Sequence, residues 1–217
     1  MMDLPDQTAQ GPTLRTWIVT GGVACGKSAV TTLIGEMLGG DRARQFSCDE
    51  EVKKLYQSPE IVRQIRRRFG AGVMADMDGA RVDRERLRQL VFGDDKRRRE
   101  LERILHPPVL ASLESARAAA AEPPRANLFV AEVPLFYEIG GTVPADHVIV
   151  VASSPDQQVS RLMQHRGLDR TQAESIVGAQ LPILDKVQKA SKVIWNDGSM
   201  EALEDQIACL VSLLDTQ

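Results

Sequence analysis

Residues 16–28 read TWIVTGGVACGKS, and the last eight of them, Gly21–Ser28, match the pattern G-x-x-x-x-G-K-[ST]. The β-branched and aromatic run Thr16–Thr20 predicts a buried strand that stops at the first glycine. From Lys27 to Leu38 apolar residues recur at helical spacing, and Gly39-Gly40 is a typical end signal. A glycine-rich turn between a strand and a helix is the context in which this pattern binds phosphate.

The spacing within the loop explains how it would hold a nucleotide. Gly21 and Gly26 let the backbone wrap around phosphate oxygens, while amide groups at the helix N-terminus bind the anion. Lys27 is expected to reach the β- and γ-phosphates of ATP, and the Ser28 hydroxyl to ligate Mg²⁺. The predicted nucleotide-binding residues of the loop are Gly22, Val23, Ala24, Cys25, Gly26, Lys27, Ser28 and Ala29. A chance match in a surface turn, or a loop that binds nucleotide without turnover, would explain the same pattern.

Further strand patterns appear at residues 43–48, 127–133, 147–152 and 192–195, separated by helical patterns. Strands that alternate with helices predict an α/β fold, a three-layer sandwich with a parallel sheet. The C-terminal part of the chain contains a helix expected over 169–189, which a capping box at Asp169 and Gln172 would start.

The segment from Glu50 to about Ala121 is almost entirely helical in pattern. Breaks are expected near Pro59, at residues 70–79 and at Pro107-Pro108. Because this segment lies between the second and third strands, it forms an insertion at the carboxyl edge of the sheet. That edge is where such folds bind ligands.

Composition narrows the classes of function. The net charge is -3, which argues against a nucleic-acid partner. Cys25, Cys48 and Cys209 show no CxxC spacing, so a reducing, cytoplasmic setting fits better than a disulfide or zinc framework. Residues 1–14 look like a disordered leader without the apolar run of a signal peptide. No apolar stretch approaches the ~18 residues of a membrane span, so no membrane partner is expected.

An ordered series of motifs resembles that of the dephospho-CoA kinase family. The members of this family are P-loop kinases of the nucleoside-monophosphate-kinase type. TGGVACGKSAV, residues 20–30, is similar to the family's TGGIGSGKST. The other similar motifs follow in the family's order: Ser47-Cys48-Asp49, Asp83-Arg84 with Leu87 and Val91-Phe92, Leu101–Pro107, Glu132–Glu138, Arg161, Gln180 and Val193–Gly198. The resemblance spans residues 16–214. It implies an ATP- and Mg²⁺-dependent kinase that phosphorylates the ribose 3′-hydroxyl of dephospho-CoA, the last step of coenzyme A biosynthesis.

The resemblance also implies catalytic and metal-binding roles. Asp49 would accept the proton of the attacking hydroxyl, a role that the order of the motifs favours over the alternative of a helix N-cap. Arg161 would join Lys27 in stabilising the transferring phosphoryl group, with an ordinary surface arginine as the alternative. Glu132 would hold Mg²⁺ or its water; otherwise it is a solvated acid at a strand end.

Arg84, His106 and Glu138 are predicted, by the same resemblance, to bind the acceptor. His106 precedes Pro107, which biases it away from a helix, and a lone histidine can also be purely structural. Asn196 would border the adenine, although a turn at the end of the last strand would explain it equally well.

These inferences divide the chain into the leader and a single P-loop kinase domain at residues 15–217. Within that domain the core is expected at about 15–50 and 125–217, the acceptor-binding insertion at about 51–124 and the lid at about 165–185. No oligomeric state is predicted. Two other functions stay open: a kinase for another small acceptor, and a non-catalytic nucleotide-binding module.

Several positions depart from the family's pattern. Ala24 replaces a loop glycine, Ser47 replaces the first acid of Asp-x-Asp, and His165 aligns with a lid arginine. Ala24 matters only if its backbone needs a positive φ, which alanine tolerates poorly. Cys25 lies at a helix N-terminus beside Lys27, which suggests a lowered thiol pKa and a reactive, oxidation-sensitive cysteine. The alternative is that Cys25 is only a small residue in place of the family's serine.

Overall fold

The structure is a computed structural model that describes residues 14–123, 126–141 and 143–214. The described residues form two compact units. The first consists of the residues up to Phe46 together with those from Arg117 onward, and the second is Ser47–Ala116. Apart from Leu14, the predicted leader at residues 1–14 lies outside the described residues.

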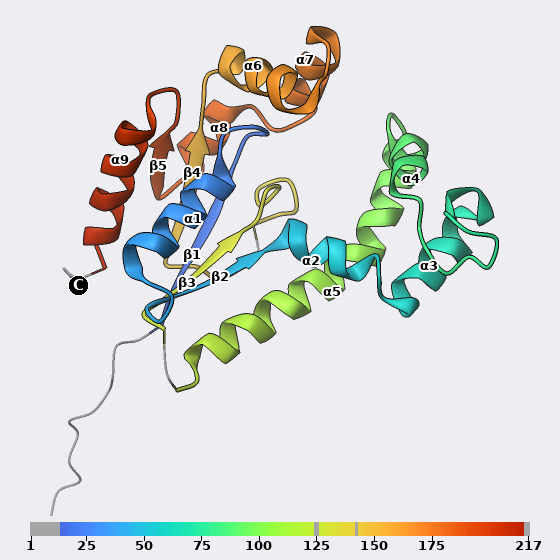
Figure 1. Ribbon diagram of the computed structural model, residues 1–217, viewed down its shortest axis with the longest axis horizontal. Coiled ribbons are helices and arrows are strands. Elements are labelled where there is room, and N and C mark those ends of the chain that lie inside the picture. Colours follow the sequence, from blue (N-terminus) through green and yellow to red (C-terminus); the bar gives the residue numbers. More distant parts are fainter. Residues whose placement is uncertain (1–13, 124–125, 142, 215–217) are drawn as a thin grey trace, which may run out of the picture. The chain divides into compact units, whose positions relative to one another are not determined.

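The first unit is built on a five-stranded parallel sheet, as predicted (Figure 1). The strands are β1 (Arg15–Gly21), β2 (Ala43–Ser47), β3 (Leu128–Glu132), β4 (His147–Ala152) and β5 (Lys192–Trp195). Each lies within one residue, at either end, of its predicted range. Their order across the sheet is β2-β3-β1-β4-β5, and β1 pairs in parallel with both β3 and β4. The loop that follows β1 therefore leaves the carboxyl edge at the middle of the sheet.

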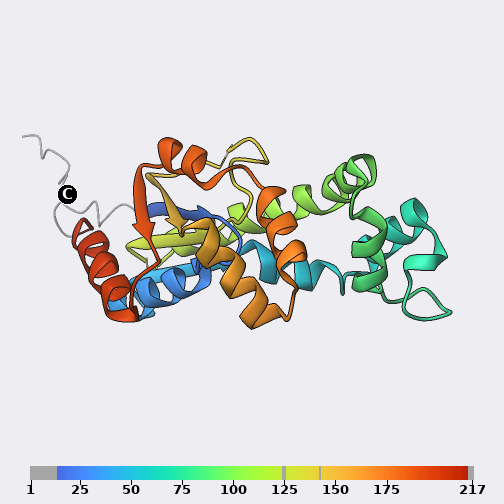
Figure 2. The same cartoon turned by 90° about the horizontal axis from the view of Figure 1, so that it is seen from above.

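Helices cover both faces of this sheet. Helices α1 (Lys27–Leu38) and α9 (Met200–Ser212) lie on one face, and α8 (Ile183–Lys189) lies on the other (Figure 2). Because both faces are covered, the central strands β1, β3 and β4 are largely apolar, and Trp17, Ile18 and Val19 are completely buried.

The remaining helices of the first unit are α6 (Pro155–Arg166) and α7 (Arg170–Gly178), which pack against each other. The predicted capping box is present: Asp169 accepts from the Gln172 amide, and the Gln172 side chain accepts from the Asp169 amide. The single helix predicted over 169–189 is wrong, because α7 ends at Gly178 and α8 starts at Ile183. Pro182 explains the interruption, since proline disfavours the helical conformation in the residue before it.

The second unit consists of helices with a hydrophobic core of their own. These are α2 (Cys48–Leu55), α3 (Pro59–Phe69), the 3₁₀ turn η1 (Ala71–Val73), α4 (Arg84–Val91) and α5 (Asp95–Ala121), whose last residues belong to the first unit. The buried members of this core are Ile61, Val62, Ile65, Val73, Met74, Leu87 and Leu105. The predicted break near Pro59 is confirmed. Pro59 is the first residue of α3, a position that suits proline.

The predicted break at Pro107-Pro108 is wrong, because α5 continues through both prolines. Leu105, Val109 and Leu113 are buried at helical spacing on either side of them. This apolar stripe supplies packing that offsets the backbone hydrogen bonds that the prolines cannot make.

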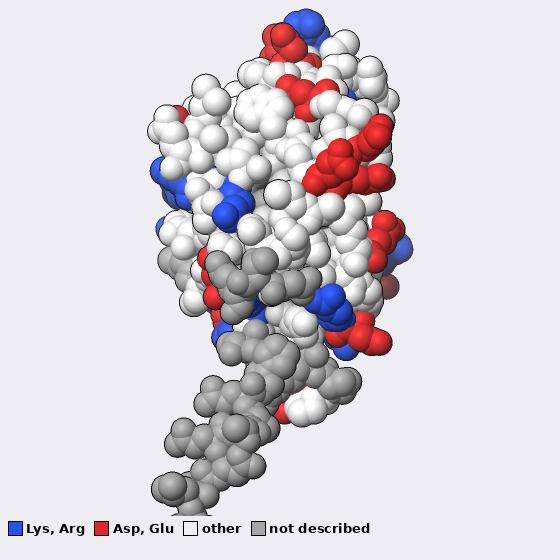
Figure 3. All heavy atoms as spheres, turned by 90° about the vertical axis from the view of Figure 1, so that its left-hand side faces the viewer, with Lys and Arg blue, Asp and Glu red and all other residues white. Residues whose placement is uncertain are grey.

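Within the described residues, no helix combines the length and apolarity that a bilayer crossing requires. On the face of the first unit that carries α9, acidic and basic side chains lie scattered among uncharged ones (Figure 3). This mixture matches the small net charge of the chain.

Candidate functional site

The loop between β1 and α1 has the geometry of a phosphate-binding loop. At Gly21, whose φ is 147°, a Cβ atom would lie 2.0 Å from the carbonyl oxygen of Val151. At Gly26, whose φ is 90°, a Cβ atom would lie 2.4 Å from Asn196 Nδ2. Glycine is therefore required at both ends of the loop, as the motif predicts.

Ala24 lies within the loop with a φ of 56°. Among the described residues it is the only non-glycine residue with a positive φ. The backbone at this position therefore has the positive φ that alanine tolerates poorly, so the replacement of the family's glycine matters here. A left-handed alanine costs about 1–2 kcal/mol relative to a right-handed one, so the loop is held in a strained conformation.

Lys27 and Ser28 begin α1 beneath the loop. Lys27 Nζ donates a hydrogen bond to the Gly22 carbonyl oxygen at 2.8 Å, so its ammonium group lies against the loop backbone. The Ser28 hydroxyl donates to Glu132 Oε1 at 3.0 Å. This contact forms because β3, which ends at Glu132, is the neighbour of β1 in the sheet.

The pair of Ser28 and Glu132 fits a magnesium ion chemically. Glu132 is only 6% exposed, and its second oxygen lies 3.5 Å from the Thr31 hydroxyl. Hydroxyl and carboxylate oxygens are ligands that Mg²⁺ prefers, and it commonly takes only one or two from protein beside those of phosphate. The described residues contain no cluster of three or more His, Cys, Asp or Glu side chains that could hold a metal. A P-loop site does not require one.

Arg161 extends from α6 to the backbone of the loop. Its guanidinium group donates to the Ala24 carbonyl oxygen at 3.2 Å, to Ser153 Oγ at 3.1 Å and to the Asn196 carbonyl oxygen at 2.8 Å. Arg161 therefore joins the loop to the carboxyl ends of β4 and β5. Its position beside the loop agrees with a role at the transferring phosphate, which stays a prediction.

Asn196 and Cys25 are in contact below the loop. Asn196 is buried and its Nδ2 donates to the Cys25 carbonyl oxygen at 2.9 Å. The Cys25 side chain is completely buried, and burial raises the pKa of its thiol despite the opposing effect of Lys27. The predicted low pKa is wrong, because desolvation of the thiolate outweighs the nearby positive charge.

Three predicted site residues belong to the second unit. Asp49 is an exposed residue in the first turn of α2, and the N-cap of that helix is Ser47, which accepts from the Glu50 amide. The interpretation of Asp49 as the cap is therefore wrong, and its role as a base stays a prediction.

Arg84 lies over the Tyr56 ring at 5.3 Å. His106 is half-buried within α5, so its expected place outside a helix is wrong.

A family model described as dephospho-CoA kinase matches residues 17–202 of this chain. The chain belongs to the dephospho-CoA kinase family. A dephospho-CoA kinase from Syntrophotalea carbinolica is 36% identical over 198 residues, which cover 90% of each chain.

Solved structures share the fold of this chain. A protein from Thermus thermophilus has a TM-score of 0.76 at 28% identity, covering 92% of this chain and 97% of its own. A dephospho-CoA kinase from Campylobacter jejuni has a TM-score of 0.59 and covers 93% of this chain and 97% of its own; at 24% identity it shows the fold alone. The predicted fold class and the predicted dephospho-CoA kinase family, an ATP-dependent kinase family, are confirmed.

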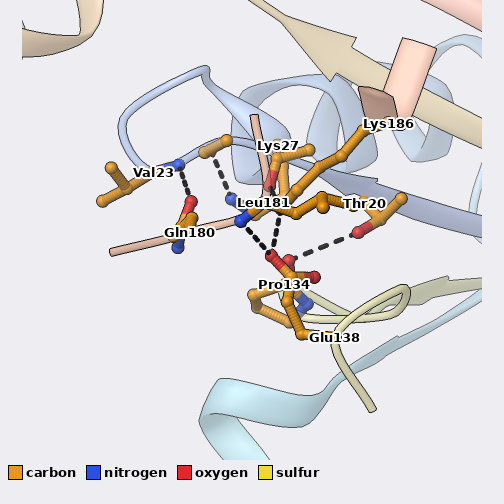
Figure 4. Close-up of polar contacts among 10 residues, drawn as sticks. Thr20, Val23, Lys27, Pro134, Glu138, Gln180, Leu181 and Lys186 are labelled. Atoms are coloured by element: carbon orange, nitrogen blue, oxygen red, sulfur yellow. Dashed lines mark hydrogen bonds and ion pairs between the residues drawn. The ribbon is translucent and has the colours of Figure 1, made fainter. Parts of the chain in front are cut away.

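Sequence reasoning missed one charged residue of this dephospho-CoA kinase family member. Lys186 of α8 is completely buried, and its Nζ lies 2.7 Å from Glu138 Oε1 and 3.3 Å from the Gly21 carbonyl oxygen (Figure 4). The available signal was weak: Lys186 is three residues from Ile183, on the apolar side of a short helix. Glu138 is engaged with α8 in this way, and its predicted contact with the acceptor stays a prediction.

Proposed function

We propose that this protein transfers the γ-phosphoryl group of ATP to the ribose 3′-hydroxyl of dephospho-CoA, which gives coenzyme A. The observation that carries the proposal is the family match over residues 17–202, in a chain that keeps Lys27, Ser28 and Glu132 together at one edge of its sheet. The curated relative from Syntrophotalea carbinolica is named for the same activity.

The loop and the lysine account for the nucleotide side of the reaction. The backbone amide groups of the loop and the N-terminus of α1 attract the phosphates of ATP. Lys27 Nζ, which contacts the Gly22 carbonyl oxygen, exchanges this partner for β- and γ-phosphate oxygens. Arg161, held beside the Ala24 carbonyl, adds positive charge where the phosphoryl group is transferred. Asn196, which follows β5, borders the adenine in this proposal.

Ser28 and Glu132 would hold magnesium, directly or through water. When bound, Mg²⁺ neutralises charge on the β- and γ-phosphates. The Ser28 hydroxyl donates to Glu132 Oε1, which would leave its lone pairs available to the cation. The buried Glu132 carboxylate would balance the cation's charge in a place with little competing water.

The second unit supplies the acceptor side. Asp49, exposed at the start of α2, takes the proton of the attacking 3′-hydroxyl. Arg84 and His106 bind dephospho-CoA, whose pyrophosphate favours cationic partners. The segment around α7 serves as a lid that excludes water, which would otherwise compete for the phosphoryl group. We also propose a cytoplasmic location, which rests on the cysteine pattern.

A coupled ADP-release assay with ATP and Mg²⁺, with and without dephospho-CoA, tests the proposal. We expect release that depends on dephospho-CoA, with coenzyme A as the product. Asp49→Asn should lower kcat by about 10²–10⁴-fold, the usual contribution of a general base. Glu50→Gln removes a charge from the adjacent exposed residue of the same helix and should retain activity within about threefold.

The possible outcomes separate the rival functions. Turnover with a nucleoside monophosphate or another small acceptor, and not with dephospho-CoA, would replace the proposed substrate. Tight ATP binding without transfer to any acceptor would indicate a nucleotide-binding module. Equal activity of Asp49→Asn and Glu50→Gln would leave the reaction in place and remove Asp49 as the base.

A further inference from the structure

Residues 180–186, which include the end of the connection from α7 and the first residues of α8, contact two consecutive peptide groups of the phosphate loop. Lys186 Nζ donates to the carbonyl oxygen of Gly21 at 3.3 Å, and the side-chain oxygen of Gln180 accepts from the amide of Val23 at 2.8 Å (Figure 4). Both contacts reach across more than 150 residues of sequence. We call residues 180–186 the strap.

These contacts control the direction in which loop peptides point. A trans peptide is planar, so its carbonyl and its amide point to opposite sides. Lys186 holds the Gly21 carbonyl and thereby turns the Gly22 amide away from the strap. The next peptide is held at both ends, because Lys27 binds the Gly22 carbonyl and Gln180 binds the Val23 amide.

Without such contacts, the loop would be free to rotate at this point. Gly21 and Gly22 are adjacent residues without a Cβ atom, and glycine occupies a wide range of backbone conformations. A reversed peptide would point a carbonyl oxygen, in place of an amide, at a bound phosphate. The strap therefore holds the Gly21–Gly22 peptide in the orientation that leaves the Gly22 amide available to an anion.

Glu138 joins the two ends of the strap. Its Oε1 lies 2.7 Å from Lys186 Nζ and accepts from the Leu181 amide at 3.3 Å. A completely buried ammonium group is costly unless a counter-charge is close, and Glu138 supplies that charge. An apolar side chain in place of Lys186 would cost less free energy to bury. Stability alone therefore does not account for a lysine at this position.

We propose that Lys186, supported by Glu138 and Gln180, is a positioning residue for phosphoryl transfer. It fixes the peptide groups of Gly21 and Gly22, and through the Gly22 carbonyl it sets the place from which Lys27 reaches the phosphates. The strap begins two residues after the end of α7, so it also ties the segment predicted as a lid to the loop.

The test compares Lys186→Met with Lys189→Met, which removes the same charge from an exposed position of the same helix. Three quantities are measured: kcat and KM for ATP, the affinity for a non-hydrolysable ATP analogue by calorimetry, and the thermal midpoint. We expect Lys186→Met to lower kcat by about a hundredfold and to weaken analogue binding by about tenfold, as small misplacements of reacting groups do. Lys189→Met should stay within about twofold of the wild type.

A double variant separates positioning from stability. Lys186→Met with Glu138→Gln replaces the charged pair with neutral side chains of similar size, so the thermal midpoint should recover toward that of the wild type. The proposal expects the affinity for the ATP analogue, which does not depend on the predicted acceptor contact of Glu138, to stay low despite this recovery. Recovery of that affinity together with the thermal midpoint would overturn it, because the lysine would then serve folding alone.

A further variant keeps the test decisive if neither the single nor the double Lys186 variant folds. Gln180→Ala removes the contact with the Val23 amide and leaves the charged pair intact, and it should weaken analogue binding by about tenfold. Wild-type affinity for the analogue and wild-type kcat in this variant would overturn the proposed role of the strap. Analogue binding needs no acceptor, so this result is independent of whether dephospho-CoA is the substrate.

Discussion

Ala24 and Cys25 are neighbours in the phosphate loop, and their properties differ from those expected of a flexible, reactive loop. Ala24 has the left-handed backbone that suits glycine, and Cys25 is a buried thiol with a raised pKa. Burial raises the pKa of the Cys25 thiol, while Asn196 and Arg161 hold the loop backbone by binding the carbonyl groups of Cys25 and Ala24. Neighbouring contacts therefore fix the loop backbone even where a residue disfavours the resulting conformation.

The strained alanine gives a stability prediction. Ala24→Gly should raise the free energy of unfolding by about 0.5–1 kcal/mol, because removal of the left-handed penalty exceeds the extra entropy of an unfolded glycine. Urea denaturation measures the change. Ala208→Gly, at an exposed interior position of α9, is the control and should lower the same free energy by about 1 kcal/mol. Equal losses in the two variants would contradict a positive φ at Ala24.

At the scale of whole elements, proline has different effects at three places in the chain. Pro59 starts α3, Pro182 precedes α8 and separates it from α7, and Pro107-Pro108 lie inside α5 without ending it. The difference reflects packing, because the α5 prolines are flanked by buried Leu105 and Val109. A proline breaks a helix only where tertiary contacts do not compensate for the lost hydrogen bonds.

The continuity of α5 can be tested with Pro107→Ala. Because Pro107 is exposed, alanine removes little packing, while it restores an amide donor within the helix. The free energy of unfolding should rise by about 1–3 kcal/mol in chemical denaturation. Pro59→Ala, at the first position of α3, should change it by less than about 0.5 kcal/mol. A loss of stability in Pro107→Ala would mean that the chain turns there.

The whole molecule divides its proposed tasks between two units. The first contains the loop, Arg161 and the strap around a parallel sheet, and the second is a helical unit with a separate core. Because each unit has its own packing, substitutions in the second unit should weaken binding of the acceptor and leave the affinity for ATP unchanged.

Arg84→Ala tests this division of labour. It should raise the KM for dephospho-CoA by about tenfold, the effect of losing roughly one charge-assisted hydrogen bond, and leave the affinity for the ATP analogue unchanged. The control is Arg88→Ala, one turn further along α4, where an exposed arginine pairs with Glu85. A parallel loss of ATP affinity in Arg84→Ala would show that Arg84 acts on both substrates.

The sequence by itself determined the features that depend on local pattern. All five strands, α1 and its phosphate loop, and the capping box of α7 follow from apolar spacing, glycine positions and a polar start signal within a few residues of each other. The order of motifs along the chain identified the family, which the comparisons confirm.

Only the tertiary structure decided the features that depend on contacts between distant residues. Lys186 and Gly21 are 165 residues apart, and Arg161 and Ala24 are 137 residues apart. The raised pKa of Cys25 and the continuity of α5 likewise result from burial, which local pattern leaves open. The physical reason is the same in each case: desolvation and long-range hydrogen bonds outweigh local preferences of a fraction of a kcal/mol to a few kcal/mol.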